Sequence, residues 1–155
     1  MVTSLAIKIL SILLIGEQNS GKTVEDVQRS HIEANVPAPS NFTRFLRRDL
    51  ADYFAKVRRG HKPPKVDFEM LRDGPTQSGV SYPKFYLWVR VESGKTVDDR
   101  GAVRVEAIER TRFAITDFVS ERAIRGDSIG LRRVFPGPVC EKIEQKIGIV
   151  PPQRP

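Results

Sequence analysis

The sequence predicts an α+β fold, in which one long amphipathic helix packs on a four-stranded antiparallel meander that C-terminal helices close. Two patterns carry this prediction. Residues 41–58 place apolar side chains at helical spacing, and residues 66–119 contain four segments in which apolar and polar residues alternate. Turn-rich segments separate these four segments without an intervening helix, which is typical of antiparallel strands joined in sequence.

Length and composition indicate one basic globular domain. The chain has 155 residues, which suits a single domain, and its 39% of hydrophobic residues are enough for a core. A net charge of +7 is compatible with nucleic acid, an anionic surface or an acidic partner, and it is also common in proteins that bind none of these. The single cysteine, Cys140, excludes an intrachain disulfide, and one cysteine with two histidines does not supply the ligands of a typical structural zinc site. We therefore expect no metal.

The long helix is expected over residues 41–58, with Ser40 as its N-cap. Its apolar stripe consists of Phe42, Phe45, Leu46, Leu50, Tyr53, Phe54 and Val57. The basic residues on its polar side belong to the densest basic stretch of the chain, residues 44–65. The residues that we assign to a possible polyanion site are Arg44, Arg47, Arg48, Arg58, Arg59 and Lys62. The alternative is a solvated helix face whose last cations complement the helix dipole.

The strongest strand pattern is YPKFYLWVRV, residues 82–91, which holds the only tryptophan of the chain. Aromatic and β-branched residues suit a pleated, mostly buried surface, so we expect a central strand. One face carries Phe85, Leu87, Val89 and Val91. The other face carries Tyr86 and Trp88, and these two side chains with Phe118 form a possible ligand face, unless the C-terminal helices cover it.

Three further strands are expected at residues 66–70, 102–108 and 112–119, with turns at 72–79 and 92–101. In the last strand Asp117 falls on the same side as Phe113 and Ile115, which indicates either the end of the strand or a carboxylate in a pocket. Short helical turns should follow, and a last helix between Pro138 and Gly148 completes the domain.

The first residues allow two interpretations. The run MVTSLAIKILSILLI is too short to span a bilayer and resembles the apolar region of a signal peptide. On this interpretation residues 1–25 are a leader, 26–40 a linker, 41–148 the domain and 149–155 a flexible tail, and the protein is periplasmic or secreted. The alternative is a cytoplasmic protein in which residues 7–15 form a buried first strand.

The loop after the apolar run, GEQNSGKT, matches the pattern G-x-x-x-x-G-K-[ST] through Gly16, Gly21, Lys22 and Thr23. It resembles the opening of P-loop nucleotide-binding proteins, small GTPases included. The resemblance implies an Mg-nucleotide cofactor, with Lys22 at the phosphates, Thr23 on Mg²⁺ and Asp117 as a further candidate for the ion. However, no parallel apolar strands alternating with helices follow Thr23, as such a domain requires.

The order of one long helix, four strands and a closing helix resembles cystatin-like and NTF2-like proteins, and small exported bacterial proteins. This resemblance covers about residues 40–147 and implies a curved sheet around the helix. No nucleophile, histidine and carboxylate set indicates catalysis. The leading hypothesis is therefore an exported, non-enzymatic binding or interaction protein whose ligand is an unknown protein or small molecule. The alternatives are a P-loop nucleotide-binding protein and a polyanion binder.

Overall fold

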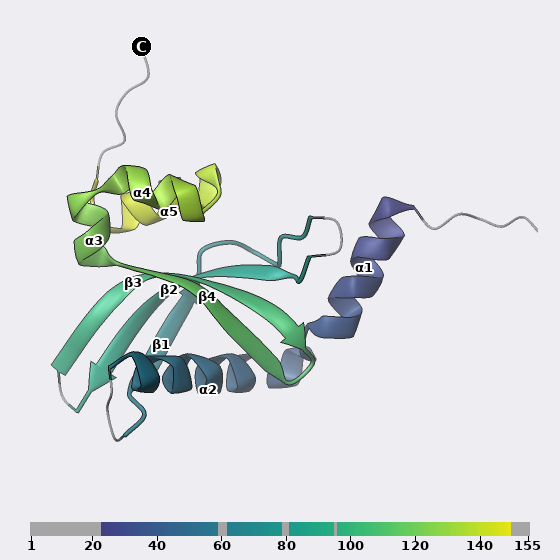
Figure 1. The fold of residues 1–155 in the computed structure, drawn as a ribbon, viewed down its shortest axis with the longest axis horizontal. Coiled ribbons are helices and arrows are strands. Elements are labelled where there is room, and N and C mark those ends of the chain that lie inside the picture. The colour runs from purple at the N-terminus through teal and green to yellow at the C-terminus, as the bar shows by residue number, and fades with distance from the viewer. Residues whose placement is uncertain (1–22, 59–61, 79–80, 95, 150–155) are drawn as a thin grey trace, which may run out of the picture.

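The computed structural model describes residues 23–58, 62–78, 81–94 and 96–149, and the domain they form has three layers (Figure 1). Helix α2 (Pro39–Val57) covers one face of a four-stranded antiparallel sheet, and three C-terminal helices cover the other face. The predicted α+β class is confirmed. The strands are β1 (Lys65–Met70), β2 (Lys84–Ser93), β3 (Thr96–Glu109) and β4 (Arg112–Ser120). The other helices are α1 (Val24–Asn35), α3 (Glu121–Gly126), α4 (Ser128–Val134) and α5 (Gly137–Lys146).

The strands are ordered β1-β2-β3-β4, so the tryptophan-bearing strand is an inner one, as predicted. The turn between β2 and β3 is shorter than the sequence suggested. β2 runs to Ser93 and β3 begins at Thr96, so most of the segment 92–101 is strand rather than turn. Gly94, at φ +68°, adopts a conformation that other residues disfavour, and this permits the tight reversal.

The two helices at the N-terminal side compare differently with the sequence. The residues after Thr23 indicate a short helix, and it is present as α1, which occupies most of the segment 26–40 and is separated from α2 only by residues 36–38. The N-cap of α2 is Ala38 rather than Ser40. Pro39 stands at the first helical position, where a missing N–H costs nothing and its fixed φ already suits a helix.

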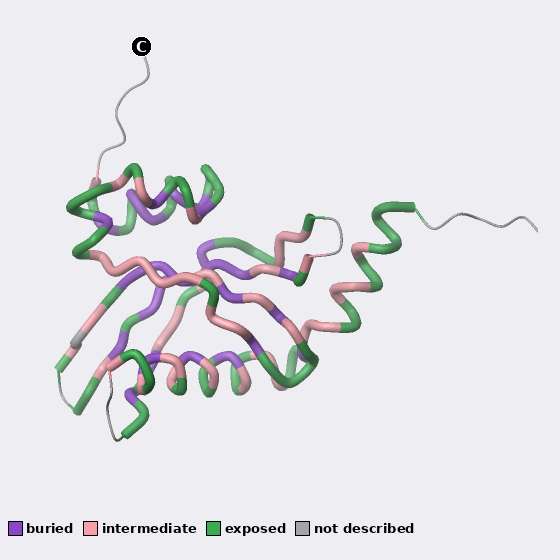
Figure 2. The backbone as a smooth tube through the Cα atoms, in the orientation of Figure 1, coloured by how far each residue is buried: buried purple, intermediate pink, exposed green. Residues whose placement is uncertain are grey.

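The first core lies between α2 and the sheet. Leu46, Leu50 and Phe54 of α2 are buried against the odd-numbered side chains of β2 and β3, and Figure 2 shows the buried positions of α2 on its sheet-facing side. Phe42 contributes edge-to-face contacts with Phe85 and Phe113, at ring distances of 5.0 and 5.1 Å. Val57, the last member of the predicted stripe, is 57% exposed and does not belong to this core.

The second core lies between the opposite face of the sheet and the C-terminal helices. Tyr86, Trp88 and Ala102 of the sheet pack against side chains of α3, α4 and α5 and their connections. The buried helical-layer members are Ile124, Leu131, Phe135, Val139, Cys140, Ile143 and Ile147. The layer of C-terminal helices covers the face of the sheet that carries Tyr86 and Trp88. Because α2 covers the other face, both faces of β2 are apolar.

A β-bulge in β4 reverses the faces of its second half. Arg104 of β3 pairs with Asp117, but the next residue, Val105, pairs with Ile115, so Thr116 is an extra residue in β4. The Thr116 hydroxyl accepts a hydrogen bond from Arg104 Nε at 3.1 Å and donates one to the Arg104 carbonyl at 3.2 Å. Phe113 and Ile115 therefore face α2, whereas Asp117 faces the C-terminal helices. The predicted placement of Asp117 on the side of Phe113 is wrong for this reason.

Candidate functional site

A basic groove runs between the first half of α2 and strand β1, with a volume of about 600 Å³. We call it the α2–β1 groove. The helix lines it with Ser40, Thr43, Arg44, Arg47, Arg48 and Ala51, and the strand side contributes Pro64, Lys65 and Val66. The helical members recur at three- and four-residue intervals, which places them on one stripe of α2. No acidic side chain of the described residues lines this groove.

Two phenylalanine rings hold the guanidinium groups of the groove in place. The Arg44 and Arg48 guanidinium carbons lie 4.8 and 5.0 Å from the centroid of the Phe45 ring. The Arg47 guanidinium lies 5.9 Å from the Phe68 ring of β1, so it reaches from the helix across to the strand. Stacking restricts the rotamers of these long side chains, which lowers the entropic cost of binding an anion.

The four cations of the groove differ in how far neighbouring oxygens already engage them. Arg48 pairs with Asp49 at 2.8 Å, and its Nη2 also donates to the Thr111 carbonyl at 2.6 Å. The hydrogen bond to Asp49 raises the pKa of Arg48. Lys65 pairs with Asp67 at 2.9 Å and with Glu92 at 3.4 Å.

Arg44 and Arg47 have the least saturated guanidinium groups of the groove. Arg44 donates to the neutral Asn41 side chain at 2.9 Å, and neither arginine has an ion pair within 4 Å among the described residues. The hydrogen bond from Lys65 lowers the pKa of the Asp67 carboxyl, and the charges of Lys65 and, to a smaller extent, Arg47 add to this shift. These two arginines are therefore the cations with most capacity for an external anion.

The structure brings together only part of the predicted polyanion set. Arg44, Arg47 and Arg48 share the groove, and Lys65 completes it from the strand. Arg58 lies at the C-terminal end of α2, where it pairs with Asp99 at 3.9 Å and stacks on Phe54. Lys62 is exposed and does not line the groove, and Arg59 lies outside the described residues. The hydroxyls of Ser40 and Thr43 were not predicted, although their spacing to Arg44 and Arg47 is visible in the sequence.

The possible ligand face does not exist as one open surface. Tyr86 and Trp88 are 4% and 8% exposed beneath the C-terminal helices. Phe118 lies on the opposite face of the sheet, where its ring contacts Phe54 of α2 at 5.0 Å. The bulge at Thr116 separates Phe118 from the other two residues because it shifts the alternation of β4 by one position.

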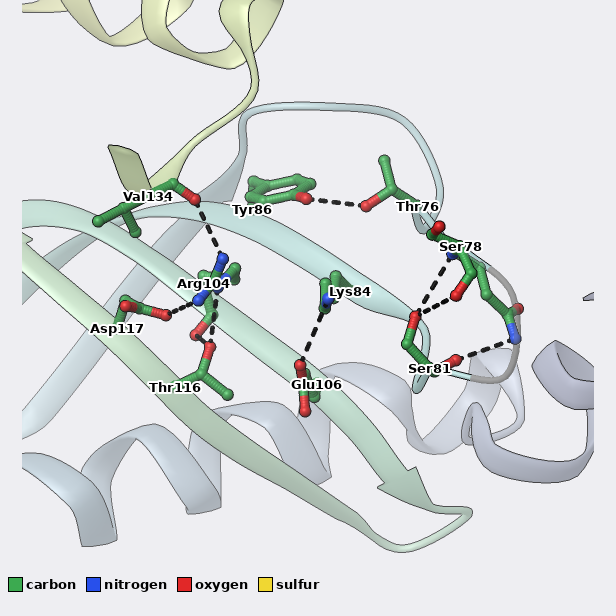
Figure 3. A network of polar contacts seen from close by, with 11 residues as sticks. Thr76, Ser78, Ser81, Lys84, Tyr86, Arg104, Glu106, Thr116, Asp117 and Val134 are labelled. Atoms are coloured by element: carbon green, nitrogen blue, oxygen red, sulfur yellow. Dashed lines mark hydrogen bonds and ion pairs between the residues drawn. The ribbon is translucent and has the colours of Figure 1, made fainter. Parts of the chain in front are cut away.

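Asp117 belongs to a polar network beneath the end of α4 (Figure 3). Arg104 Nη2 lies 2.5 Å from Asp117 Oδ2, and Arg104 Nη1 donates to the Val134 carbonyl at 3.2 Å. In the same view the Tyr86 hydroxyl lies 2.8 Å from Thr76 Oγ1. This network ties the sheet to the C-terminal helices, and the arginine already engages the carboxylate that was considered for Mg²⁺.

Of the P-loop residues, Gly16, Gly21 and Lys22 lie outside the described residues. Thr23 is the N-cap of α1, in a capping box with Asp26: its hydroxyl accepts from the Asp26 N–H at 3.2 Å and donates to the Asp26 carboxylate at 2.8 Å. No residue of α1 is buried. All strand pairs in the described sheet are antiparallel, whereas the nucleotide-binding fold needs parallel ones.

Comparison with protein-family models, curated proteins and solved structures gave no match. The resemblance to cystatin-like and NTF2-like proteins therefore stays a prediction. Within the described ranges, no helix has the length and apolar character that crossing a membrane requires. The same ranges contain no group of three or more carboxylate, imidazole or thiol side chains that could hold a metal ion.

Proposed function

We propose that this protein is a binding protein for an extended polyanion, and that the α2–β1 groove is its binding surface. The observation that carries the proposal is the stripe of two hydroxyl-bearing residues and three arginines on α2, which together with Lys65 of β1 line a groove without a carboxylate in its lining. Guanidinium and hydroxyl groups are the donors that proteins use most for phosphate and carboxylate oxygens.

The shape of the groove favours a chain-like ligand over a compact ion. The donors follow the helix from Ser40 to Arg48, and eight residues of α-helix rise about 12 Å. One compact phosphate cannot contact donors spread over that length, whereas the successive phosphates of a single nucleic-acid strand can. Phe45 and Phe68 beneath the guanidinium groups provide the stacking that orders them.

The test is the affinity of the full chain for a fluorescein-labelled 12-nucleotide oligo(dT), measured by anisotropy between 50 and 200 mM salt. We expect the double variant Arg44→Gln/Arg47→Gln to bind about tenfold more weakly, and to lower the slope of log Kd against log salt by about 1–1.5, because two phosphate contacts are lost.

The control variant is Arg122→Gln/Arg133→Gln, which removes the same net charge from two exposed arginines of the C-terminal helices. Equal weakening in both double variants would show a general charge effect and would contradict a specific groove. Absence of salt-dependent binding to oligo(dT) and to vesicles containing 30% phosphatidylserine would contradict the polyanion function itself.

A further inference from the structure

A second cavity, distinct from the α2–β1 groove, lies on the sheet face that the C-terminal helices cover. It has a volume of about 350 Å³ and lies between β1, β2, β3 and the end of α5. We call it the Trp88 cavity. Trp88 belongs to an inner strand and is only 8% exposed, and with Phe68 it supplies the apolar part of the lining. Around it stand Arg90, Arg100 and Lys146, with Asp67 and Glu69 on the β1 side.

The rim of this cavity holds a like-charged pair on neighbouring strands. Arg90 and Arg100 are directly paired in the register of β2 and β3, on the same face as Trp88. Two cations opposite each other in an antiparallel sheet repel and destabilise it. Arg90 is compensated by Glu92, whose carboxylate lies 2.9 Å from its Nε. For the guanidinium of Arg100, the described residues provide no carboxylate within 4 Å.

The other charges of the rim are already satisfied. Lys146 of α5 pairs with Glu69 of β1 at 2.6 Å, which connects the helix to the edge of the sheet. Asp67 pairs with Lys65 at 2.9 Å, and this hydrogen bond lowers the pKa of the Asp67 carboxyl. Arg100 is thus the one rim cation of the Trp88 cavity, among the described residues, without an acidic partner. It also lines a second cavity of about 450 Å³, together with Asp99 and Glu121.

We propose that the Trp88 cavity binds a small aromatic anion, whose ring packs on the indole of Trp88 and whose acid group pairs with Arg100. An anion there would remove the repulsion between Arg90 and Arg100, while the ring would cover the remaining exposed edge of Trp88. A cavity of this size, with apolar residues in its lining and few oriented polar groups, matches the general form of small-molecule sites. The proposal is independent of the polyanion function, because the two surfaces use different arginines.

The test uses the single tryptophan as a site-specific reporter. In a ¹⁵N-labelled full-length chain, one indole N–H signal arises from Trp88. We expect 2-naphthoate to shift it in a saturable way. Acetate, which has the acid group only, and 2-naphthalenemethanol, which has the ring only, should each bind at least tenfold more weakly.

Arg100→Gln should weaken 2-naphthoate binding about tenfold, and Arg100→Lys should recover part of it. The charge-matched control Arg133→Gln should bind as the unsubstituted protein does. The proposal is overturned if Arg100→Gln binds equally well, if acetate alone reproduces the saturable shift, or if no saturable shift occurs. Binding of 2-naphthoate without any effect of Arg100 would place the ligand elsewhere. A loss of oligo(dT) binding in the Arg44 and Arg47 variant bears only on the polyanion function.

Discussion

Asp49 Oδ2 of α2 accepts a hydrogen bond from the backbone N–H of Phe113 in β4, with an N···O distance of 2.7 Å. β4 is an edge strand, and this N–H points away from β3 toward the helix. One side chain of α2 thus satisfies an edge donor that would otherwise be half-buried without a partner. The neighbouring Arg48 adds a second link, because its Nη2 donates to the Thr111 carbonyl in the β3–β4 turn.

We expect Asp49→Ala to lower the free energy of unfolding by about 1–3 kcal/mol, because it leaves the Phe113 N–H without its acceptor. Urea denaturation followed by circular dichroism would measure the change. Asp52→Ala is the matched control: it removes the same charge from an exposed position of the same helix and should change stability by less than about 0.5 kcal/mol. If both variants lose equal stability, charge on α2 rather than the edge contact is responsible.

Gly101 of β3 pairs with Ser120 of β4, and the two strands leave no room there for a side chain. A methyl group there would stand 2.7 Å from the Phe118 ring and 2.8 Å from the Ser120 Cα, and closer still to the Val119 carbonyl oxygen. Because backbone atoms cannot yield without disturbing the strand pairing, we expect Gly101→Ala to destabilise the fold by about 1–3 kcal/mol. Gly126→Ala is the control, since nothing lies within 4 Å of the added carbon. Unchanged thermal unfolding of Gly101→Ala would refute the close approach.

Periodicity was sufficient to predict the helix on the sheet and the order of the strands, because each element buries one stripe or face and the pattern records it. It did not predict the bulge at Thr116. One extra residue moves every later side chain of the strand to the opposite face of the sheet. A threonine whose hydroxyl forms a hydrogen bond in a bulge has no distinctive signature in the sequence. The positions of Asp117 and Phe118 were misjudged for this single reason.

The candidate site was only partly predictable, because it depends on which elements become neighbours. The high density of basic residues in 44–65 was enough to predict that the arginines of α2 form a site. The same density also included Arg58, which the structure places at the C-terminal end of the helix, away from the groove. Lys65 joins the groove through strand pairing, not through its distance in sequence. Whether Tyr86 and Trp88 were open depended on the packing of three short helices, which local patterns do not determine.

Glu144 of α5 has a side chain that is only 3% exposed, and Arg132 of α4 holds both of its oxygens at 2.9 and 3.1 Å. Arg132→Gln should therefore destabilise the fold by about 1–3 kcal/mol, because it leaves a carboxylate with too few donors in the interface of two helices. Arg133→Gln, the adjacent exposed arginine, is the control. A double-mutant cycle with Glu144→Gln should give a coupling energy above about 0.5 kcal/mol, and additive effects would contradict the pairing.

Cys140 provides a prediction about alkaline pH. Its thiol is buried in the second core and lies 3.3 Å from the Phe135 carbonyl, and burial raises the pKa of this thiol. As pH rises, the thiol of the unfolded chain loses its proton first, at a pKa of about 8.5. The contribution of the buried, protonated Cys140 thiol to the free energy of unfolding is therefore complete below that pH. It declines as pH rises from there toward the pKa of the folded state. Comparison with Cys140→Ala isolates this contribution, since the other titrating groups are common to both proteins.

We expect the stability advantage of the unsubstituted protein over Cys140→Ala to be constant from pH 6 to pH 8 and to shrink between pH 8.5 and pH 10, as measured by urea unfolding. In the folded protein at pH 8, the thiol should react with Ellman's reagent only as fast as the domain opens, because the thiolate is disfavoured and covered. A difference in stability that is independent of pH up to 10, or a thiol that reacts at the rate of free cysteine, would contradict the buried, protonated state of Cys140.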